Sequence, residues 1–377
     1  MPTPIPFNVP PLTGRELEYV RDAIERRELA GNGRYTQLCT SWMKERLGVA
    51  DALLTQSCTA ALEMAAILCG IGPSDEVVMP SFAFVSMANA VVLRGGVPVF
   101  IDIRPDTLNI DESKIEGALS PRTKAIFVVH YAGIACELAT IGAIARRHEL
   151  VVVEDAAQAL LSTYRGRPAG SLGDLGCFSF HATKNVTSGE GGALVINRAD
   201  FAPRARIVWE KGTDRQKFLD GEVEKYTWLD LGSSFLPSEL TAAFLAAQLE
   251  QAETVTRDRL ATWSYYHAAF EELERRGVVT RPVVPAHTTH NGHLYYLLLG
   301  SEALRDRLIA DLNAAGITAS FHYVPLHSSS AGRRYGRTCG ALPVTEHAAR
   351  QLVRLPLWYQ MGDRAKRVAD ALIALLS

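Results

Sequence analysis

Hydrophobic and polar positions between residues 55 and 197 alternate between two patterns. Short apolar runs, typical of buried strands, cover residues 76–79, 97–102, 124–130, 150–155, 177–180 and 192–196. Between them lie stretches with helical signals, at residues 59–69, 86–93, 111–119 and 138–148. Near-continuous apolar strands separated by helices are typical of a mainly parallel sheet covered on both faces. The pattern therefore predicts an α/β fold.

The pattern changes after Pro237. Residues 238–276 contain no Gly or Pro and form one helical stretch, which unbroken would exceed about 50 Å, so we expect a break within it. Beyond it we expect a strand at 294–299, a helix at 302–315, a strand at 318–323 and a helix at 363–376. These elements predict a large domain at 1–250, whose N-terminal arm (1–30) packs with the small domain, and a small α+β C-terminal domain at 251–377.

Composition and charge exclude several classes of protein. The chain has 377 residues, 47% of them hydrophobic, with 39 basic and 41 acidic side chains. A near-neutral balance argues against binding nucleic acid through phosphate neutralisation. The longest uncharged stretch that could be taken for a membrane span is residues 77–93. It contains Pro80 and is shorter than a membrane-spanning helix requires. The start of the chain lacks the basic and apolar regions of a signal peptide.

Cysteine and histidine spacing gives no metal site. Six cysteines, at 39, 58, 69, 136, 177 and 339, lack the two-residue spacing of zinc or redox motifs, and they suit a reducing cytoplasm. His287, His290 and His293 have three-residue spacing, but prolines precede them and no Cys, Asp or Glu lies nearby. We expect a polar loop there, with metal binding as the less favoured alternative.

Candidate chemistry lies at the carboxyl ends of the predicted strands, where open α/β sheets bind ligands. Asp155 closes one strand, Lys184 follows another by four residues, and residues 57–60 begin the Ala-rich helix. Taken singly, each has a plain explanation: Asp155 as a helix cap, Lys184 as a surface ammonium and Thr59 as an N-cap. Taken together, they suit one ligand with an anion, a cationic nitrogen and an aldehyde.

Those three groups are the phosphate, pyridine nitrogen and aldehyde of pyridoxal 5′-phosphate (PLP). A helix N-terminus binds phosphate, a buried Asp keeps a ring nitrogen protonated, and a Lys forms a Schiff base. Ser179 could add a hydroxyl to the phosphate, Gln158 could bond the ring, and Phe84 could cover its face. No glycine-rich dinucleotide turn follows the first strand, which argues against a nicotinamide enzyme.

Ordered motifs along nearly the whole chain resemble the DegT/DnrJ/EryC1/StrS sugar aminotransferases. They include residues 154–158, the run 178–185 around Lys184, and residues 189–193, with further matches at 5–11, 57–62, 129–133, 321–327 and 355–357. The resemblance implies a PLP enzyme of fold type I, like aspartate aminotransferase. Lys184 and Asp155 would be catalytic, and the cofactor would contact Thr59, Ala60, Phe84, Asp155, Gln158, Ser179, Lys184 and Ser234.

The resemblance also implies substrates and an assembly. L-glutamate would donate the amine to a dTDP-linked keto-sugar. Residues 8–14 and 225–234 favour dTDP-4-keto-6-deoxy-D-glucose, although a 3-keto or another 4-keto sugar stays open. The enzyme would be a homodimer, with Ser234 and residues 32–35 reaching across the interface. Ser234 stands where many members have Asn, and Ala83 where a Thr is frequent.

Two rival functions and several contacts stay open. Relatives that dehydrate deoxysugars have His at the position of Lys184 or need a cysteine cluster, and neither occurs in this chain. A PLP-binding regulator without turnover would need an added DNA-binding or signalling module. Candidate diphosphate or sugar contacts are Arg15, Lys211, His322 and His327, each equally suited to a surface role.

Overall fold

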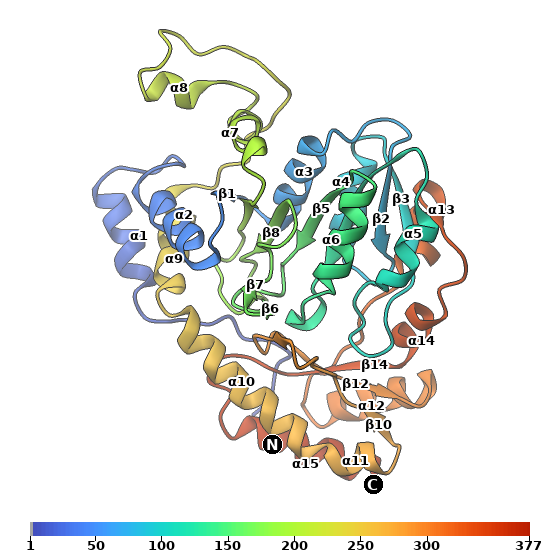
Figure 1. Ribbon diagram of the computed structural model, residues 1–377. Coiled ribbons are helices and arrows are strands. Elements are labelled where there is room, and N and C mark those ends of the chain that lie inside the picture. The colour runs from blue at the N-terminus through green and yellow to red at the C-terminus, as the bar shows by residue number, and fades with distance from the viewer. Residues whose placement is uncertain (1–2) are drawn as a thin grey trace.

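A computed structural model describes residues 3–377, and a central eight-stranded sheet dominates it (Figure 1). The strand order is β1-β9-β8-β5-β4-β2-β3-β13. All neighbours are parallel except β9, which runs antiparallel to both β8 and β1. The predicted α/β fold with a mainly parallel sheet is confirmed. The bounds are β1 Asp51–Thr55, β2 Glu76–Pro80, β3 Val97–Ile101, β4 Thr123–Val129, β5 Val151–Asp155, β8 Leu175–Ser179, β9 Gly192–Ile196 and β13 Arg337–Thr338.

Helices cover both faces of this sheet, which is why its central strands are apolar throughout. One hydrophobic core lies beneath α2, α6 and α9, and a second lies beneath α3, α4 and α7. The bounds are α1 Glu16–Glu25, α2 Arg34–Leu47, α3 Cys58–Leu68, α4 Val85–Val92, α5 Ile115–Ala118, α6 Leu138–Arg147, α7 Ala202–Trp209 and α9 Glu239–Leu249. The predicted helix at 111–119 is shorter than expected, with a 3₁₀ turn at Glu112–Lys114 before α5.

The C-terminal part has a core of its own around a three-stranded antiparallel sheet, β10-β12-β14. Helices α10, α12 and α15 pack on it, and Ile5 of the N-terminal arm is buried in the same core. The bounds are α10 Ala252–Ala269, α11 Glu271–Arg275, β10 Val279–Thr280, β12 Tyr295–Leu299, α12 Glu302–Ala314, α13 Ser330–Tyr335, α14 Pro343–Gln351, β14 Leu352–Leu355 and α15 Arg364–Leu376.

Two predictions for this region have different outcomes. The helical stretch 238–276 is interrupted, as expected, at Glu250–Gln251 and again at Phe270. The predicted strand at 318–323 is wrong. Within that segment only Ser320 makes an isolated bridge, to Arg354, and the residue before the segment, Ile317, makes another to Ile5. Leu326, just beyond the segment, bonds to Ser81 of the large domain. Strand β14 fills the place beside β12 instead.

Two smaller features lie outside the cores. A minor sheet joins β6 (Thr163–Tyr164) to β7 (Arg167–Pro168) and β11 (Thr288–Thr289). The segment between α7 and α9, which includes α8 (Arg215–Leu219), extends away from the rest of the molecule in Figure 1. Within residues 3–377, no helix combines the length and hydropathy needed to span a membrane.

Candidate active site

A cavity of about 640 Å³ lies where the carboxyl ends of the central strands face the C-terminal part of the chain. Residues from distant parts of the sequence line it. Six of the predicted cofactor contacts are among them: Thr59, Phe84, Asp155, Gln158, Ser179 and Lys184. The cavity walls do not include the remaining two predicted contacts, Ala60 and Ser234.

Asp155 ends β5 and is 5% exposed. One of its oxygens, Oδ1, accepts a hydrogen bond from the backbone N–H of Ala157 at 3.0 Å, and the thiol of Cys58 lies 3.9 Å from it. Burial raises the pKa of Asp155, although the nearby ammonium of Lys184 acts in the opposite direction. A carboxylate that burial destabilises will bind strongly to a cationic group brought next to it.

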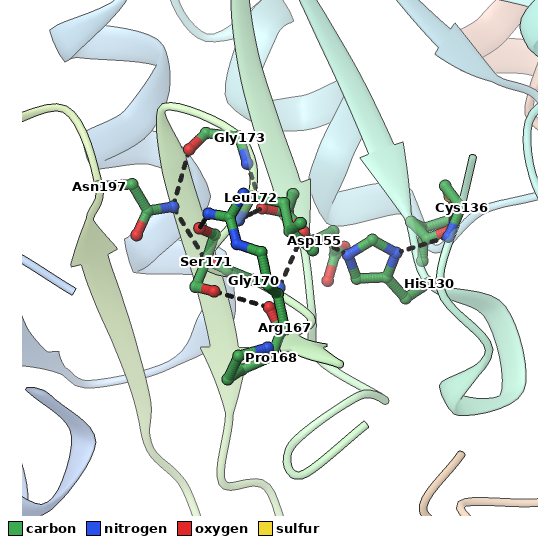
Figure 2. Close-up of polar contacts among 12 residues, drawn as sticks. His130, Cys136, Asp155, Arg167, Pro168, Gly170, Ser171, Leu172, Gly173 and Asn197 are labelled. Atoms are coloured by element: carbon green, nitrogen blue, oxygen red, sulfur yellow. Dashed lines mark hydrogen bonds and ion pairs between the residues drawn. The ribbon is translucent and has the colours of Figure 1, made fainter. Parts of the chain in front are cut away.

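The residue before Asp155, Glu154, fixes the end of this strand through His130 and the 170–173 loop, and Figure 2 shows both of these beside Asp155. Glu154 is fully buried and accepts a 2.7 Å contact from His130 Nε2. Backbone N–H groups of Gly170, Leu172 and Gly173 also donate to its carboxylate. Burial acts to raise the pKa of Glu154, but these hydrogen bonds outweigh it and lower the pKa. Glu154 thus ties β5 to the 170–173 loop and holds Asp155 in place.

Lys184 lies in the turn that follows β8. Its backbone N–H donates to His181 O at 2.9 Å, and Asn8 Nδ2 of the N-terminal arm donates to Ala182 O at 3.2 Å. Burial lowers the pKa of Lys184, with the charge of Asp155 acting in the opposite direction. A lowered pKa increases the fraction of neutral amine, which is the nucleophile that attacks an aldehyde.

The N-terminus of α3 forms the part of the cavity suited to an anion. Ser57 is the N-cap, with its Oγ accepting from Ala60 N at 3.1 Å, so the alternative that assigned this role to Thr59 is wrong. Thr59 Oγ1 instead lies 2.7 Å from Ser86 Oγ. Strand β9 runs close by, because a Cβ on Gly192 would lie 2.3 Å from the Ser57 carbonyl carbon. The first-turn amides before Ala60 remain available for phosphate.

Gln158 and Phe84 line the part of the cavity that would hold the cofactor ring. Gln158 is held at both ends: its Oε1 accepts from Ala132 N at 2.7 Å, and its Nε2 donates to Tyr323 Oη at 3.0 Å. Phe84, at the N-cap of α4, is 57% exposed and lines the cavity. An aromatic side chain left exposed at a cavity wall is available to stack on a flat ligand.

Most of the proposed diphosphate or sugar contacts lie elsewhere. Arg15 pairs with Glu18 and Glu250, Lys211 with Glu210, and His327 with Ser81 and Glu346. None of these three lines the cavity, whereas His322 does. Ser234 is exposed and pairs with Glu210 in an isolated bridge on the segment that carries α8.

For several residues that line the cavity, no contact with the cofactor or substrate was predicted from the sequence. They come mainly from the N-terminal arm and the C-terminal part: Phe7, Asn8, Cys58, His293, Tyr323 and Arg354. Phe7, Asn8, Cys58 and Tyr323 lie within the matched motifs 5–11, 57–62 and 321–327. No spacing relates these residues, His293 or Arg354 to Lys184, so the local sequence does not indicate what they contact. His293 lines this cavity, and residues 3–377 contain no group of three or more His, Cys, Asp or Glu side chains that could hold a metal ion.

The residues around this cavity fit PLP. A buried carboxylate with a raised pKa, a lysine with a lowered pKa and a helix N-terminus face one space. They match the three polar groups of the cofactor. Such a site on an α/β fold of this kind defines a PLP-dependent aminotransferase.

The chain belongs to the DegT/DnrJ/EryC1/StrS aminotransferase family, whose model matches residues 10–373. It is therefore a sugar aminotransferase that uses PLP, the cofactor present in solved members of this fold. Among curated proteins it is similar to GDP-perosamine synthase of Caulobacter vibrioides, with 36% identity over 322 residues, which is 84% of each chain.

Solved structures show the same likeness. The aminotransferase TlmJ from Streptoalloteichus hindustanus superposes with a TM-score of 0.90 at 32% identity, covering 99% of this chain and 98% of TlmJ. DesI, solved in the presence of its TDP-sugar product, gives a TM-score of 0.89 at 30% identity, covering 100% and 94%.

Proposed function

We propose that this enzyme transfers the amino group of L-glutamate to a dTDP-linked keto-deoxysugar. The favoured acceptor is dTDP-4-keto-6-deoxy-D-glucose, which would give dTDP-4-amino-4,6-dideoxy-D-galactose. Residues 8–14 and 225–234 resemble enzymes with this product, and the TDP-sugar of DesI supports the nucleotide. The GDP-sugar in the name of the Caulobacter relative keeps another nucleotide as the second candidate.

The observation that carries the chemistry is that Asp155 and Lys184 face the same cavity. PLP, when bound, supplies an aldehyde that takes up an amine and a ring that accepts carbanion charge. Asp155 would hold a proton at the ring nitrogen. Lys184 would hold the cofactor at rest and then move a proton at the substrate carbon as acid and base. Ser179, Thr59 and the start of α3 would bind the phosphate.

We further propose that residues 1–250 hold the cofactor and that residues 251–377 close over it. Tyr323 and Arg354 reach the cavity from the second part. Because polar bonds such as Gln158 to Tyr323 join the two parts, closure would exclude water from the reacting groups.

A homodimer is also part of the proposal. The segment around α8 exposes a group of large apolar side chains: Phe218, Leu219, Tyr226, Trp228 and Leu229. Exposed apolar patches of this kind mark interaction surfaces. Ser234, on the same segment and not among the residues that line the cavity of its own chain, would contact the cofactor of the second subunit. Sedimentation should show a dimer at micromolar concentration, and a monomer would contradict this.

Two measurements test the function. Mixing the PLP-loaded protein with L-glutamate should change the cofactor absorbance as the amine is transferred, whereas a binder without turnover would show no change. Incubation with L-glutamate and dTDP-4-keto-6-deoxy-D-glucose, followed by mass spectrometry and NMR, should identify a 4-amino sugar. An amine at carbon three, or loss of a hydroxyl without amine gain, would overturn the proposed acceptor or reaction.

A further inference from the structure

We propose that Arg354 binds the α-carboxylate of the amino-acid donor. The inference rests on the proposed function, in which an amino acid supplies the amine. Arg354 lies on β14, and its neighbours Val353 and Leu355 are fully buried in the C-terminal core. Because side chains alternate along a strand, Arg354 points the opposite way, toward the cavity that it lines. In Figure 1, β14 is the strand of the small sheet nearest the large sheet.

Two contacts hold the guanidinium of Arg354 in place. Its Nε and Nη2 both donate to the backbone carbonyl of Phe321, at 3.2 and 2.9 Å. From another side its Cζ lies 4.7 Å from the ring centroid of Phe7 on the N-terminal arm. Within residues 3–377, Nη1 has no hydrogen-bond partner, and it is not among the fully buried atoms that lack one. The guanidinium is therefore fixed in position with a donor left for a ligand.

The charges around the cavity leave Arg354 without an anion. Lys184 and Arg354 supply the lysine and arginine charges of its walls, and Asp155 and Glu190 supply the acidic ones. Asp155 is assigned to the cofactor nitrogen, and Glu190 lies 3.6 Å from His181 near solvent. In the described part of the chain no carboxylate forms an ion pair with Arg354. A partly buried cation without a partner is unfavourable, and a ligand carboxylate would relieve this.

The position of Arg354 favours an α-carboxylate over a diphosphate. Arg354 and Lys184 line the same cavity, and the charge of Arg354 acts to lower the pKa of Lys184. The α-carboxylate of an amino acid is attached to the same carbon as the reacting amine. A sugar diphosphate is separated from carbon four by several bonds of the hexose ring. The α-carboxylate can therefore lie between a lysine that handles this carbon and the guanidinium of Arg354, a group that binds carboxylates well.

Calorimetric titration of the PLP-loaded protein with 2-oxoglutarate tests this inference without requiring turnover. Arg354→Met should weaken 2-oxoglutarate binding about 100-fold, because one or two charge-assisted hydrogen bonds are lost. Arg354→Lys, which keeps the charge but not the planar fork, should weaken it about 10-fold. Arg307→Met is the matched control, since Arg307 is an exposed arginine on α12 whose side chain is 78% exposed, and it should bind as the wild type does.

A second titration with dTDP separates the two ligand sites. Arg354→Met should bind dTDP as tightly as the wild type. Loss of dTDP binding with unchanged 2-oxoglutarate binding would assign the guanidinium to the diphosphate and overturn the inference. Unchanged 2-oxoglutarate binding in Arg354→Met would also overturn it, and if that variant unfolds, unchanged binding in Arg354→Lys has the same consequence. Arg354-dependent binding together with no amine transfer from any amino acid would instead refute only the proposed function.

Discussion

At the amino end of β2 the central sheet buries Glu76, and at the carboxyl end of β5 it buries Asp155. Glu76 accepts hydrogen bonds from Arg337, Arg122 and the hydroxyl of Ser120. The bonds from Arg337 are the largest cause that lowers its pKa to about 2. Asp155 forms no ion pair within residues 3–377, and burial raises its pKa.

The difference separates stability from function on one sheet. At Glu76, arginines compensate the buried charge, so the ionised form stabilises the fold. At Asp155 the fold leaves a buried charge to be compensated by a ligand, a common property of active sites. The same contrast extends to the cations, since Arg337 is paired with Glu76 whereas Lys184 and Arg354 face the cavity. Substitutions at the two edges should therefore affect different measurements.

The largest effect should follow Lys184→Ala. Without the amine, the protein cannot hold the cofactor covalently or move a proton at the substrate carbon, so turnover should fall about 10⁴-fold or more. The visible absorbance of covalently held cofactor should disappear with it. Lys114→Ala, at a lysine in the 3₁₀ turn before α5, is the control and should retain both. A Lys184→Ala enzyme with near-normal turnover would refute the assignment.

Asp155→Asn should have the second-largest effect on turnover. A neutral amide cannot keep the ring nitrogen protonated, so turnover should fall about 10²–10³-fold, the range for loss of one electrostatic contact. Because burial disfavours the ionised carboxylate, the cofactor-free protein should unfold at the same or a higher denaturant concentration than the wild type. Denaturation followed by circular dichroism measures this. A clear loss of stability would mean that Asp155 is structural, like Glu76.

Glu76→Gln should lower the stability and leave turnover unchanged, which is the opposite of the result expected for Asp155→Asn. Losing the charge leaves Arg337 and Arg122 without their partner, so the free energy of unfolding should fall by about 1–3 kcal/mol while turnover is retained. The pKa of Glu76 is lowered, so its contribution is complete above the unfolded value of about 4.3 and is lost as pH falls toward 2. Unfolding curves of wild type and variant should therefore converge between these pH values. A gap that stays constant with pH would show that the ionised carboxylate is not the source of the stabilisation.

Lys366→Ala should have the smallest effect. This lysine pairs with Asp370 on the exposed face of α15, far from both charged edges of the sheet. Exposed pairs of this kind are screened by water and salt and contribute little. Neither turnover nor the unfolding midpoint should change measurably, and a marked loss of stability would show that surface charge matters as much as the Glu76 cluster.

The large-domain wall of the cavity could be predicted from the sequence. Asp155 and Lys184 each follow an apolar strand, and parallel strands bring their carboxyl ends to one edge whatever the rest of the chain does. The structure places both residues at one cavity with Thr59, Ser179 and Gln158. The fold class and family follow from the same periodicity and motifs, and both are confirmed.

The opposite wall could not be predicted. Residues 318–323 alternate polar and apolar side chains as a strand does. Strand β14 nevertheless occupies the position beside β12, and Tyr323 reaches Gln158 instead. Which of two similar segments pairs with β12 depends on long-range packing, which outweighs local propensity. Arg354 belongs to no motif, and its proposed role depends on the position in which Phe7 and Phe321 hold it.

The sequence by itself determined the α/β architecture and the pair of residues suited to PLP, because strand ends and helix starts follow from local periodicity. Its ordered motifs determined the family. Only the tertiary structure decided which charges are compensated. Glu76 begins a buried strand and Asp155 ends one, and neither position says whether a distant arginine will compensate the charge. Arg337 lies 261 positions from Glu76 along the chain, and this distant contact makes one carboxylate structural while the other stays available to a ligand.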